Sequence, residues 1–204
     1  MFTGIVERTG TVRELEERET TRRVTIACGS DFAKELRLGD SVAVDGACLT
    51  AVAVLDDAFE VDVIGTSLAR TVASGYTEGR VVNLEKAMKM SGRLDGHLVQ
   101  GHVDGVGCLN HIRRDGEFWR MEVRIPPDVA AQTVERGSIT INGVSLTVAD
   151  MPEPAVCGIG LVPFTYEHTN LGLLQPDDPV NVEGDLIGKY VGKILADRAR
   201  GSQA

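Results

Sequence analysis

The sequence contains two copies of one module, and this duplication restricts the fold more than any other feature. Sliding the chain against itself by 97 residues places Gly4 on Gly101 and Val6 on Val103. The same shift aligns SVAVDGACLT (41–50) with SITINGVSLT (138–147). One inserted residue near 151–154 makes the shift 98 afterwards, so that VNLE (82–85) meets VNVE (180–183). Self-similarity at a fixed spacing indicates that each copy folds as one structural unit.

Each copy has the sequence pattern of a small antiparallel barrel. Asp45-Gly46 and Asn142-Gly143 stand between alternating apolar residues, which is typical of a tight hairpin with positive φ at both turn positions. We therefore expect an all-β fold, with two tandem six-stranded antiparallel Greek-key barrels related by internal duplication, plus a C-terminal α-helix. The other strand-like runs are 4–12, 23–28, 59–64 and 80–85 in the first copy, and 102–109, 120–125, 156–162 and 179–183 in the second. Short helices are expected at 31–36, 67–70, 128–134 and 165–168.

The last segment follows the second copy and belongs to neither. We divide the chain into an N-terminal barrel (1–96), a C-terminal barrel (97–185) and a helix with its tail (186–204). Asp185 stands where a helix N-cap belongs. The helix has an apolar stripe that consists of Ile187, Tyr190, Val191, Ile194 and Leu195. We predict that this stripe packs either on the barrels of its own chain or against the same helix in neighbouring subunits.

Charge and cysteine usage exclude several classes of protein. The formal net charge is -9, which disfavours a nucleic-acid ligand. Neither a signal peptide nor a run of membrane-spanning length is evident, so no membrane association and a cytoplasmic protein are expected. The four cysteines form no C-x-x-C pair, and His97 and His102 lack metalloprotease spacing, so we expect reduced thiols and no metal site.

Six motifs, in register over nearly the whole chain, carry a resemblance to a known family: MFTGIVE, DGACLT, GHLVQGHVDGVG, INGVSLTV, FTYEHTNLG and VNVEGDLIGKYV. Together they resemble the riboflavin synthase family. The resemblance implies the last step of riboflavin biosynthesis. In that reaction two molecules of 6,7-dimethyl-8-ribityllumazine exchange a four-carbon unit, giving riboflavin and 5-amino-6-ribitylaminopyrimidinedione, without a cofactor or metal.

The resemblance also carries expectations about assembly and about rival functions. Similar proteins are homotrimers held by their C-terminal helices, with each active site between the N-terminal barrel of one subunit and the C-terminal barrel of another. Lumazine synthase enters as a candidate partner. The alternative within this fold is a non-catalytic lumazine- or flavin-binding fluorescent antenna protein. A flavin-reductase fragment is disfavoured, because no nucleotide-binding βαβ unit follows the barrels.

Five residues are candidates for the chemistry. Cys48 and Ser145 are equivalent under the 97-residue shift, and the resemblance gives them a role in delivering or orienting a nucleophile. His97 has no counterpart in the first copy and is suited to proton transfer near neutral pH. Asp185 is either a helix cap alone or also orients a catalytic group. Phe2 is either a barrel plug or a ring that stacks near the ligand.

Substrate contacts are expected from backbone amides and hydroxyls of matching segments, with Asp62 reaching the ribityl chain. They are Gly4, Ile5, Val6, Cys48, Leu49, Thr50, Asp62, Val63, Ile64, Gly65, Thr66 and Ser67 in the first copy, and Gly101, His102, Val103, Arg136, Ser145, Leu146, Thr147, Gly160, Leu161, Val162, Pro163, Phe164 and Thr165 in the second. One departure concerns the first copy, which has Thr66-Ser67 where the family usually has Glu-Thr.

Overall fold

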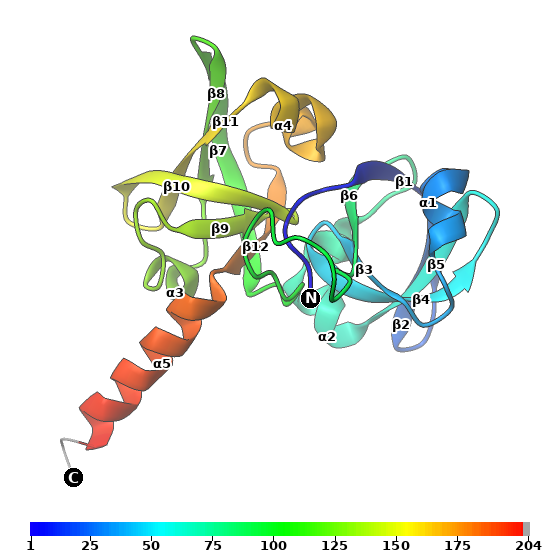
Figure 1. Cartoon of the computed structure of the whole chain (residues 1–204), viewed down its shortest axis with the longest axis horizontal. Coiled ribbons are helices and arrows are strands. Elements are labelled where there is room, and N and C mark those ends of the chain that lie inside the picture. Colours follow the sequence, from blue (N-terminus) through cyan, green and yellow to red (C-terminus); the bar gives the residue numbers. More distant parts are fainter. Residues whose placement is uncertain (202–204) are drawn as a thin grey trace.

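The computed structural model describes residues 1–201 as two closed six-stranded antiparallel barrels and a C-terminal helix, which confirms the predicted fold class. Figure 1 shows the barrels side by side, with the amino terminus between them. The first barrel has the order β1-β2-β5-β4-β3-β6, and the second repeats this cyclic order with β7 in place of β1. The strands are β1 (Arg8–Glu17), β2 (Thr21–Ala27), β3 (Ser41–Val44), β4 (Ala47–Val54), β5 (Ala58–Ile64) and β6 (Val81–Lys86), then β7 (Gly105–Asp115), β8 (Phe118–Arg124), β9 (Ser138–Ile141), β10 (Val144–Glu153), β11 (Val156–Leu161) and β12 (Pro179–Gly184).

The inserted residue of the second copy is absorbed by its longer hairpin. The β4–β5 pair has one register shift, between Ala51 and Ala53. The β10–β11 pair has the equivalent shift between Val148 and Asp150, and a second one between Asp150 and Glu153. An extra residue in one strand of an antiparallel pair produces such a bulge. The second bulge thus lies where the sequence alignment predicts the insertion.

The short helices also recur in both copies. They are α1 (Ser30–Glu35) and α2 (Gly65–Arg70) with a 3₁₀ turn at Val72–Gly75, then α3 (Pro127–Ala130) and α4 (Pro163–His168) with a 3₁₀ turn at Asn170–Leu173. Helix α3 is shorter than the predicted 128–134. The carbonyl oxygen of Val129 accepts from both the Thr133 hydroxyl at 2.8 Å and the Thr133 amide at 3.0 Å, so a hydrogen-bonded turn continues past the end of the helix.

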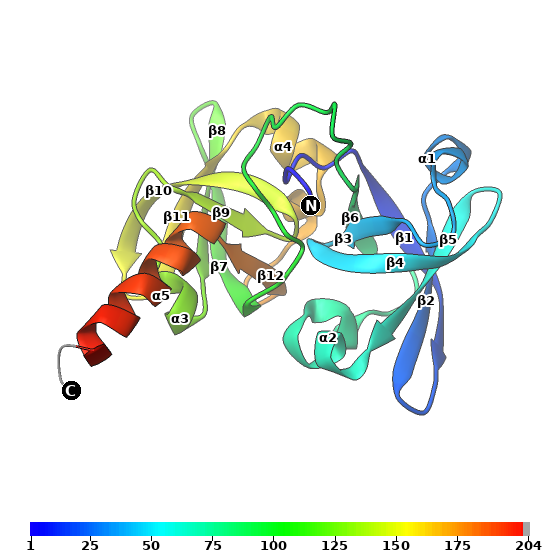
Figure 2. The ribbon, with the colours of Figure 1, turned by 60° about the horizontal axis from the view of Figure 1, so that its bottom comes forward.

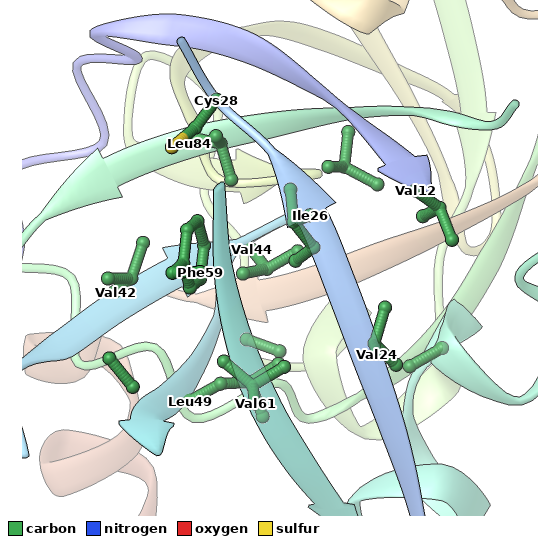
Figure 3. Close-up of a cluster of buried hydrophobic side chains, with 14 of the residues drawn as sticks. Val12, Val24, Ile26, Cys28, Val42, Val44, Leu49, Phe59, Val61 and Leu84 are labelled. Carbon is green, nitrogen blue, oxygen red and sulfur yellow. The ribbon is translucent and has the colours of Figure 1, made fainter. Parts of the chain in front are cut away.

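Alternating apolar residues of the strands fill each barrel. Figure 3 shows the first core, where Ile26, Phe59 and Leu84 project from different strands into one cluster. These three side chains are completely buried. A second cluster of the same kind, which includes Leu109, Met121 and Ile159, fills the other barrel. Because the inner faces are used by the cores, side chains that bind a ligand must come from the outer faces or from loops.

The two barrels meet at their central hairpin turns. Asp45 and Gly46 have φ of 45° and 79°, and Asn142 and Gly143 have φ of 46° and 78°, which confirms the predicted turns. A Cβ added to Gly46 would lie 2.6 Å from the backbone nitrogen of Gly143, so only glycine fits at this contact. The duplication thus produces an approximate two-fold axis that passes between the turns.

Buried polar groups surround this axis. The Oδ1 atom of Asp45 accepts from the Asn83 amide and from Asn170 Nδ2, both at 2.8 Å, and its Oδ2 accepts from the Tyr76 hydroxyl at 2.9 Å. Asn181 donates to the Asp45 carbonyl oxygen at 2.8 Å. Since Asn170 and Asn181 belong to the second copy, the network joins the barrels and fixes their relative orientation.

Helix α5 (Leu186–Gly201) extends away from the second barrel. Figure 2 shows it beside α3, and a Cβ on Gly192 would lie 3.5 Å from the Gln132 side chain. The predicted apolar stripe remains exposed, from 50% at Val191 to 68% at Ile187, so it does not lie on its own barrels. Within residues 1–201, no helix is both long enough and apolar enough to cross a membrane.

Candidate functional site

Two segments cross from one barrel to the other, and we call them the crossing segments 2–7 and 99–104. They meet at Phe2 and Val99, whose backbones exchange hydrogen bonds of 2.7 and 3.1 Å. Val6 packs against the core of the second barrel, and Val103 packs against the core of the first. The predicted strands 4–12 and 102–109 therefore begin only at Arg8 and Gly105, because the residues before them are drawn onto the opposite barrel.

This exchange changes how the expected ligand contacts are grouped. The sequence assigns Gly4, Ile5 and Val6 to the first copy. Gly4 is nevertheless bound to Ser145 and Val6 packs on the second barrel, whereas Ile5 lines a cavity on the first-barrel side. The segment Gly101, His102 and Val103 lies over the first barrel. Each candidate pocket is thus built from both copies.

The pocket on the first barrel is centred on Cys48 and Thr50, which project from the outer face of β4. The Cys48 amide donates to the Gly101 carbonyl oxygen at 2.8 Å. Gly101 has φ of 77°, and a Cβ there would lie 2.6 Å from the Cys48 Cβ. A glycine is required at this point because the backbone of the crossing segment lies directly on the strand.

The pocket on the second barrel repeats this arrangement with Ser145 and Thr147 on β10. The Ser145 amide donates to the Gly4 carbonyl oxygen at 2.7 Å, and a Cβ on Gly4 would lie 2.6 Å from the Ser145 Cβ. The two pockets are thus related by the approximate two-fold axis, as the alignment of Cys48 with Ser145 predicts.

The surroundings of Ser145 and Cys48 are chemically different. His97 Nδ1 lies 2.7 Å from Ser145 Oγ, and its Nε2 lies 3.2 Å from Thr140 Oγ1. Ala43, the counterpart of Thr140, packs with Phe2 and Val99 in an apolar cluster beside Cys48. The second pocket therefore has a hydroxyl-imidazole-hydroxyl group, whereas the thiol of the first stands beside apolar side chains. Phe2 is completely buried, in this small cluster and not in the core of either barrel.

Burial lowers the pKa of His97, and the nearby Asp185 carboxylate opposes this shift. A lowered pKa keeps the imidazole neutral at neutral pH, so that it can accept a proton. The Oδ1 atom of Asp185 also accepts from the Ile187 amide at 2.9 Å, which caps α5. The structure therefore places Asp185 both at the helix start and within electrostatic range of His97.

Asp62 is already engaged by arginines. Its carboxylate accepts from Arg23 Nε and Nη2, both at 2.8 Å, and lies 3.5 Å from Arg18 Nη1. The hydrogen bond from Arg23 lowers the pKa of Asp62, which keeps it ionised. A ribityl hydroxyl reaching Asp62 would join an existing ion pair.

The remaining expected contacts divide by orientation. Leu49, Val63, Leu146 and Leu161 point into the cores, so only their backbones can face a ligand. Those with exposed side chains or backbones are Ile5, Thr50, Ile64, Gly65, Thr66, His102, Arg136, Thr147, Gly160, Val162, Pro163 and Phe164. Ser67 and Thr165 are half-buried at equivalent places, on α2 and α4. Arg136, with φ of 65°, lies before β9, where its amide donates to the Val148 carbonyl oxygen at 2.8 Å.

A cavity of about 710 Å³ lies on the first-barrel side of crossing segment 2–7. It is lined by Thr3, Ser41, Lys86 and neighbouring residues, and among the described residues it shares only Ile5 with the expected contacts. Within residues 1–201, no group of three or more His, Cys, Asp or Glu side chains could hold a metal ion. This cavity is lined by none of Cys48, Thr50, Ser145 and Thr147.

Sequence reasoning missed Thr140, Glu85 and Glu183. Thr140 could have been found from the aligned hairpins, because the 97-residue shift aligns it with Ala43 and the two side chains differ in polarity. The glutamates end the VNLE and VNVE motifs, and their repetition in both copies was the available signal.

Comparison with known proteins gives consistent results. The family model described as "Lumazine binding domain" matches residues 3–87 and 100–185. The riboflavin synthase of Bacillus subtilis (strain 168) is 38% identical over 195 residues, covering 96% of this chain and 90% of the relative. The riboflavin synthase of Mycobacterium tuberculosis (strain ATCC 25618 / H37Rv) is 40% identical over 199 residues, covering 96% and 98%.

Solved structures of LumP have the same fold. LumP complexed with 6,7-dimethyl-8-(1'-D-ribityl) lumazine is 26% identical, with a TM-score of 0.82, and the match covers 90% of this chain and 99% of LumP. LumP complexed with riboflavin gives a TM-score of 0.84 with the same identity and coverage.

Proposed function

This chain belongs to the riboflavin synthase family of enzymes, and on that premise we propose that it converts two molecules of 6,7-dimethyl-8-ribityllumazine into riboflavin and 5-amino-6-ribitylaminopyrimidinedione. One lumazine gives up a four-carbon unit and the other receives it, so no external oxidant or reductant is consumed. The observation that carries the proposal is the pair of similar pockets with different chemistry, one at Ser145 and His97 and one at Cys48.

Within this proposal the second pocket handles protons. His97 accepts a proton from Ser145, from a water or from the substrate methyl group, and Thr140 holds the imidazole from its other side. Asp185 stabilises the imidazolium that forms. Cys48 supplies or orients the nucleophile in the first pocket, and the cluster that contains Phe2 packs against Cys48. Positioning two rings face to face supplies much of the rate acceleration.

Assembly follows from the exposed helix. The apolar stripe on α5 supports a homotrimer in which the C-terminal helices pack together. Each active site then forms between the N-terminal barrel of one subunit and the C-terminal barrel of another. The exposed Thr50 and Thr147 support this arrangement, since a neighbouring barrel would cover them and exclude water.

The test is to incubate the purified protein with 6,7-dimethyl-8-ribityllumazine alone and follow lumazine absorbance and flavin fluorescence. We expect lumazine loss and riboflavin formation in a ratio of about two to one, as the stoichiometry of the dismutation requires. Ser145→Ala and Cys48→Ala should reduce the rate by about 10²-fold or more while lumazine still binds. Tight lumazine binding without riboflavin formation by the unmodified protein would favour the antenna alternative instead.

A further inference from the structure

Two buried glutamates end equivalent strands of the two barrels. Glu85 on β6 is 5% exposed and Glu183 on β12 is 3% exposed. A buried carboxylate is costly unless it accepts hydrogen bonds. Neither glutamate contacts the proposed reacting groups directly, so their partners indicate what they do.

Glu85 binds the crossing segment 2–7. Its Oε1 accepts from the Thr3 amide at 2.6 Å and from the Thr3 hydroxyl at 2.8 Å, and its Oε2 accepts from the Gly4 amide at 3.0 Å. Both carboxylate oxygens are thus used, and all three donors lie in two consecutive residues. Charge-assisted hydrogen bonds of this kind hold a backbone segment more firmly than neutral ones.

The carbonyl oxygens of the same two residues accept hydrogen bonds from the second pocket. The Thr3 carbonyl oxygen accepts from the His97 amide at 3.1 Å, and the Gly4 carbonyl oxygen accepts from the Ser145 amide at 2.7 Å. His97 and Ser145 are the residues whose side chains lie 2.7 Å apart. Displacing Thr3 and Gly4 would therefore move the two partners of that contact.

Glu183 makes the reciprocal arrangement with fewer bonds. Its Oε1 accepts from the Gln100 amide at 2.8 Å, and the next residue, Gly101, accepts from the Cys48 amide at 2.8 Å. Its Oε2 is buried, and the Gly101 amide as well as the Gln100 amide lowers the pKa of Glu183 against the effect of burial. Glu183 therefore faces two consecutive amides of crossing segment 99–104, as Glu85 faces two of crossing segment 2–7.

We propose that Glu85 and Glu183 are positioning residues, each of which fixes a crossing segment so that Glu85 sets the Ser145–His97 geometry and Glu183 sets the placement of Cys48. The catalytic effect of the two glutamates rests on the proposed function, whereas their effect on the position of the crossing segments does not. The carboxylate is required because it presents acceptors only. A glutamine at position 85 would turn an N–H donor toward the Thr3 or Gly4 amide.

The test compares Glu85→Gln with Glu183→Gln by amide hydrogen exchange. In Glu85→Gln we expect protection of the His97 and Ser145 amides to fall about tenfold, as for the loss of one or two hydrogen bonds, while the Cys48 amide stays protected. Glu183→Gln should give the reverse pattern. Each variant thus serves as the control for the other, because general destabilisation would affect all three amides in both.

Activity provides the second readout. Glu85→Gln should lower kcat about tenfold with little change in KM, since it disturbs groups near the reacting atoms. In a Ser145→Ala background the same change should have almost no further effect. Glu122→Gln is the matched control, because Glu122 is a half-buried strand glutamate that accepts from Arg120 at 3.4 Å and not from either crossing segment.

Two outcomes would overturn the inference. One is equal loss of protection at Cys48 and Ser145 in both variants, and the other is an unchanged exchange pattern in Glu85→Gln. An unmodified protein that makes no riboflavin would refute the proposed function, while the exchange experiment would still decide the placement.

Discussion

Asp45 is the most unusual single residue of the molecule. It is completely buried at the contact between the barrels, where the second copy has Asn142. Burial raises the pKa of Asp45 to about 6, although hydrogen bonds from Asn83, Tyr76 and Asn170 and the charge of Arg80 oppose the shift. The unfolded chain has the ordinary value of 3.8. The folded state therefore holds this proton over a pH range in which the unfolded state has lost it.

The contribution of Asp45 to the free energy of unfolding is largest below about pH 4. It falls by about 2 to 3 kcal/mol as the pH rises to about 6, because the folded state must then release the proton that the unfolded state has already lost. Asp45→Asn should remove this cost and raise the unfolding free energy at pH 8 by about that amount. Urea unfolding at pH 5 and pH 8 checks it. A variant that loses stability at pH 8 would show that the charged network is favourable.

His97 leads to a prediction about activity. Its neutral form is the one that accepts a proton, so kcat/KM should fall as the pH drops through the pKa of His97. Asp185→Asn removes a negative charge that raises this pKa, and the acid limb should therefore move to lower pH. Asparagine is also a good N-cap, so α5 should remain intact by circular dichroism. An acid limb that moves upward, or not at all, would argue against an interaction with His97.

At the scale of elements, α5 presents its apolar stripe without a cover from its own chain. If the proposed trimer forms through α5, Ile194→Asp should place a charge within the helix contact and give monomers with folded barrels. Ala196→Asp is the matched control, since it adds the same charge on the opposite side of the helix. Light scattering after size exclusion measures the mass of both variants. A trimer of Ile194→Asp would show that α5 does not organise the assembly.

Local sequence patterns predict the hairpins and the terminal helix because their causes are local. Asp45-Gly46 and Asn142-Gly143 allow the positive φ that the turns require. The crossing segments were predicted as strand starts, because β-branched residues such as Ile5, Val6 and Val103 fit a strand equally well. Their actual partners, such as Ser145 for Gly4, are distant in sequence, and no local pattern encodes that contact. The same limit applies to Thr140 and Glu85.

For the whole molecule, the duplication allows a test of which barrels form a site. Thr50→Trp should block the first pocket and Thr147→Trp the second, because both threonines are exposed at equivalent positions. Each variant alone should be inactive. Co-expressed in equal amounts, they should recover about a quarter of the activity if each site joins barrels of two different subunits. No recovery is expected if both barrels of a site come from one chain, and differently tagged chains allow mixed trimers to be isolated.

The crossing segments also have a consequence for how the chain matures during synthesis. Gly4 leaves the ribosome before its partner Ser145, because Ser145 belongs to the second copy. Domains usually fold in order as they emerge. Here the first barrel can close early and Glu85 can bind the amides of Thr3 and Gly4, but the carbonyl oxygens of these two residues gain their partners only when His97 and Ser145 have been made. A nascent chain that stalls between the copies would therefore leave the outer edge of this segment without its partner, and the rate of translation through the second copy becomes a physical variable in the yield of native protein.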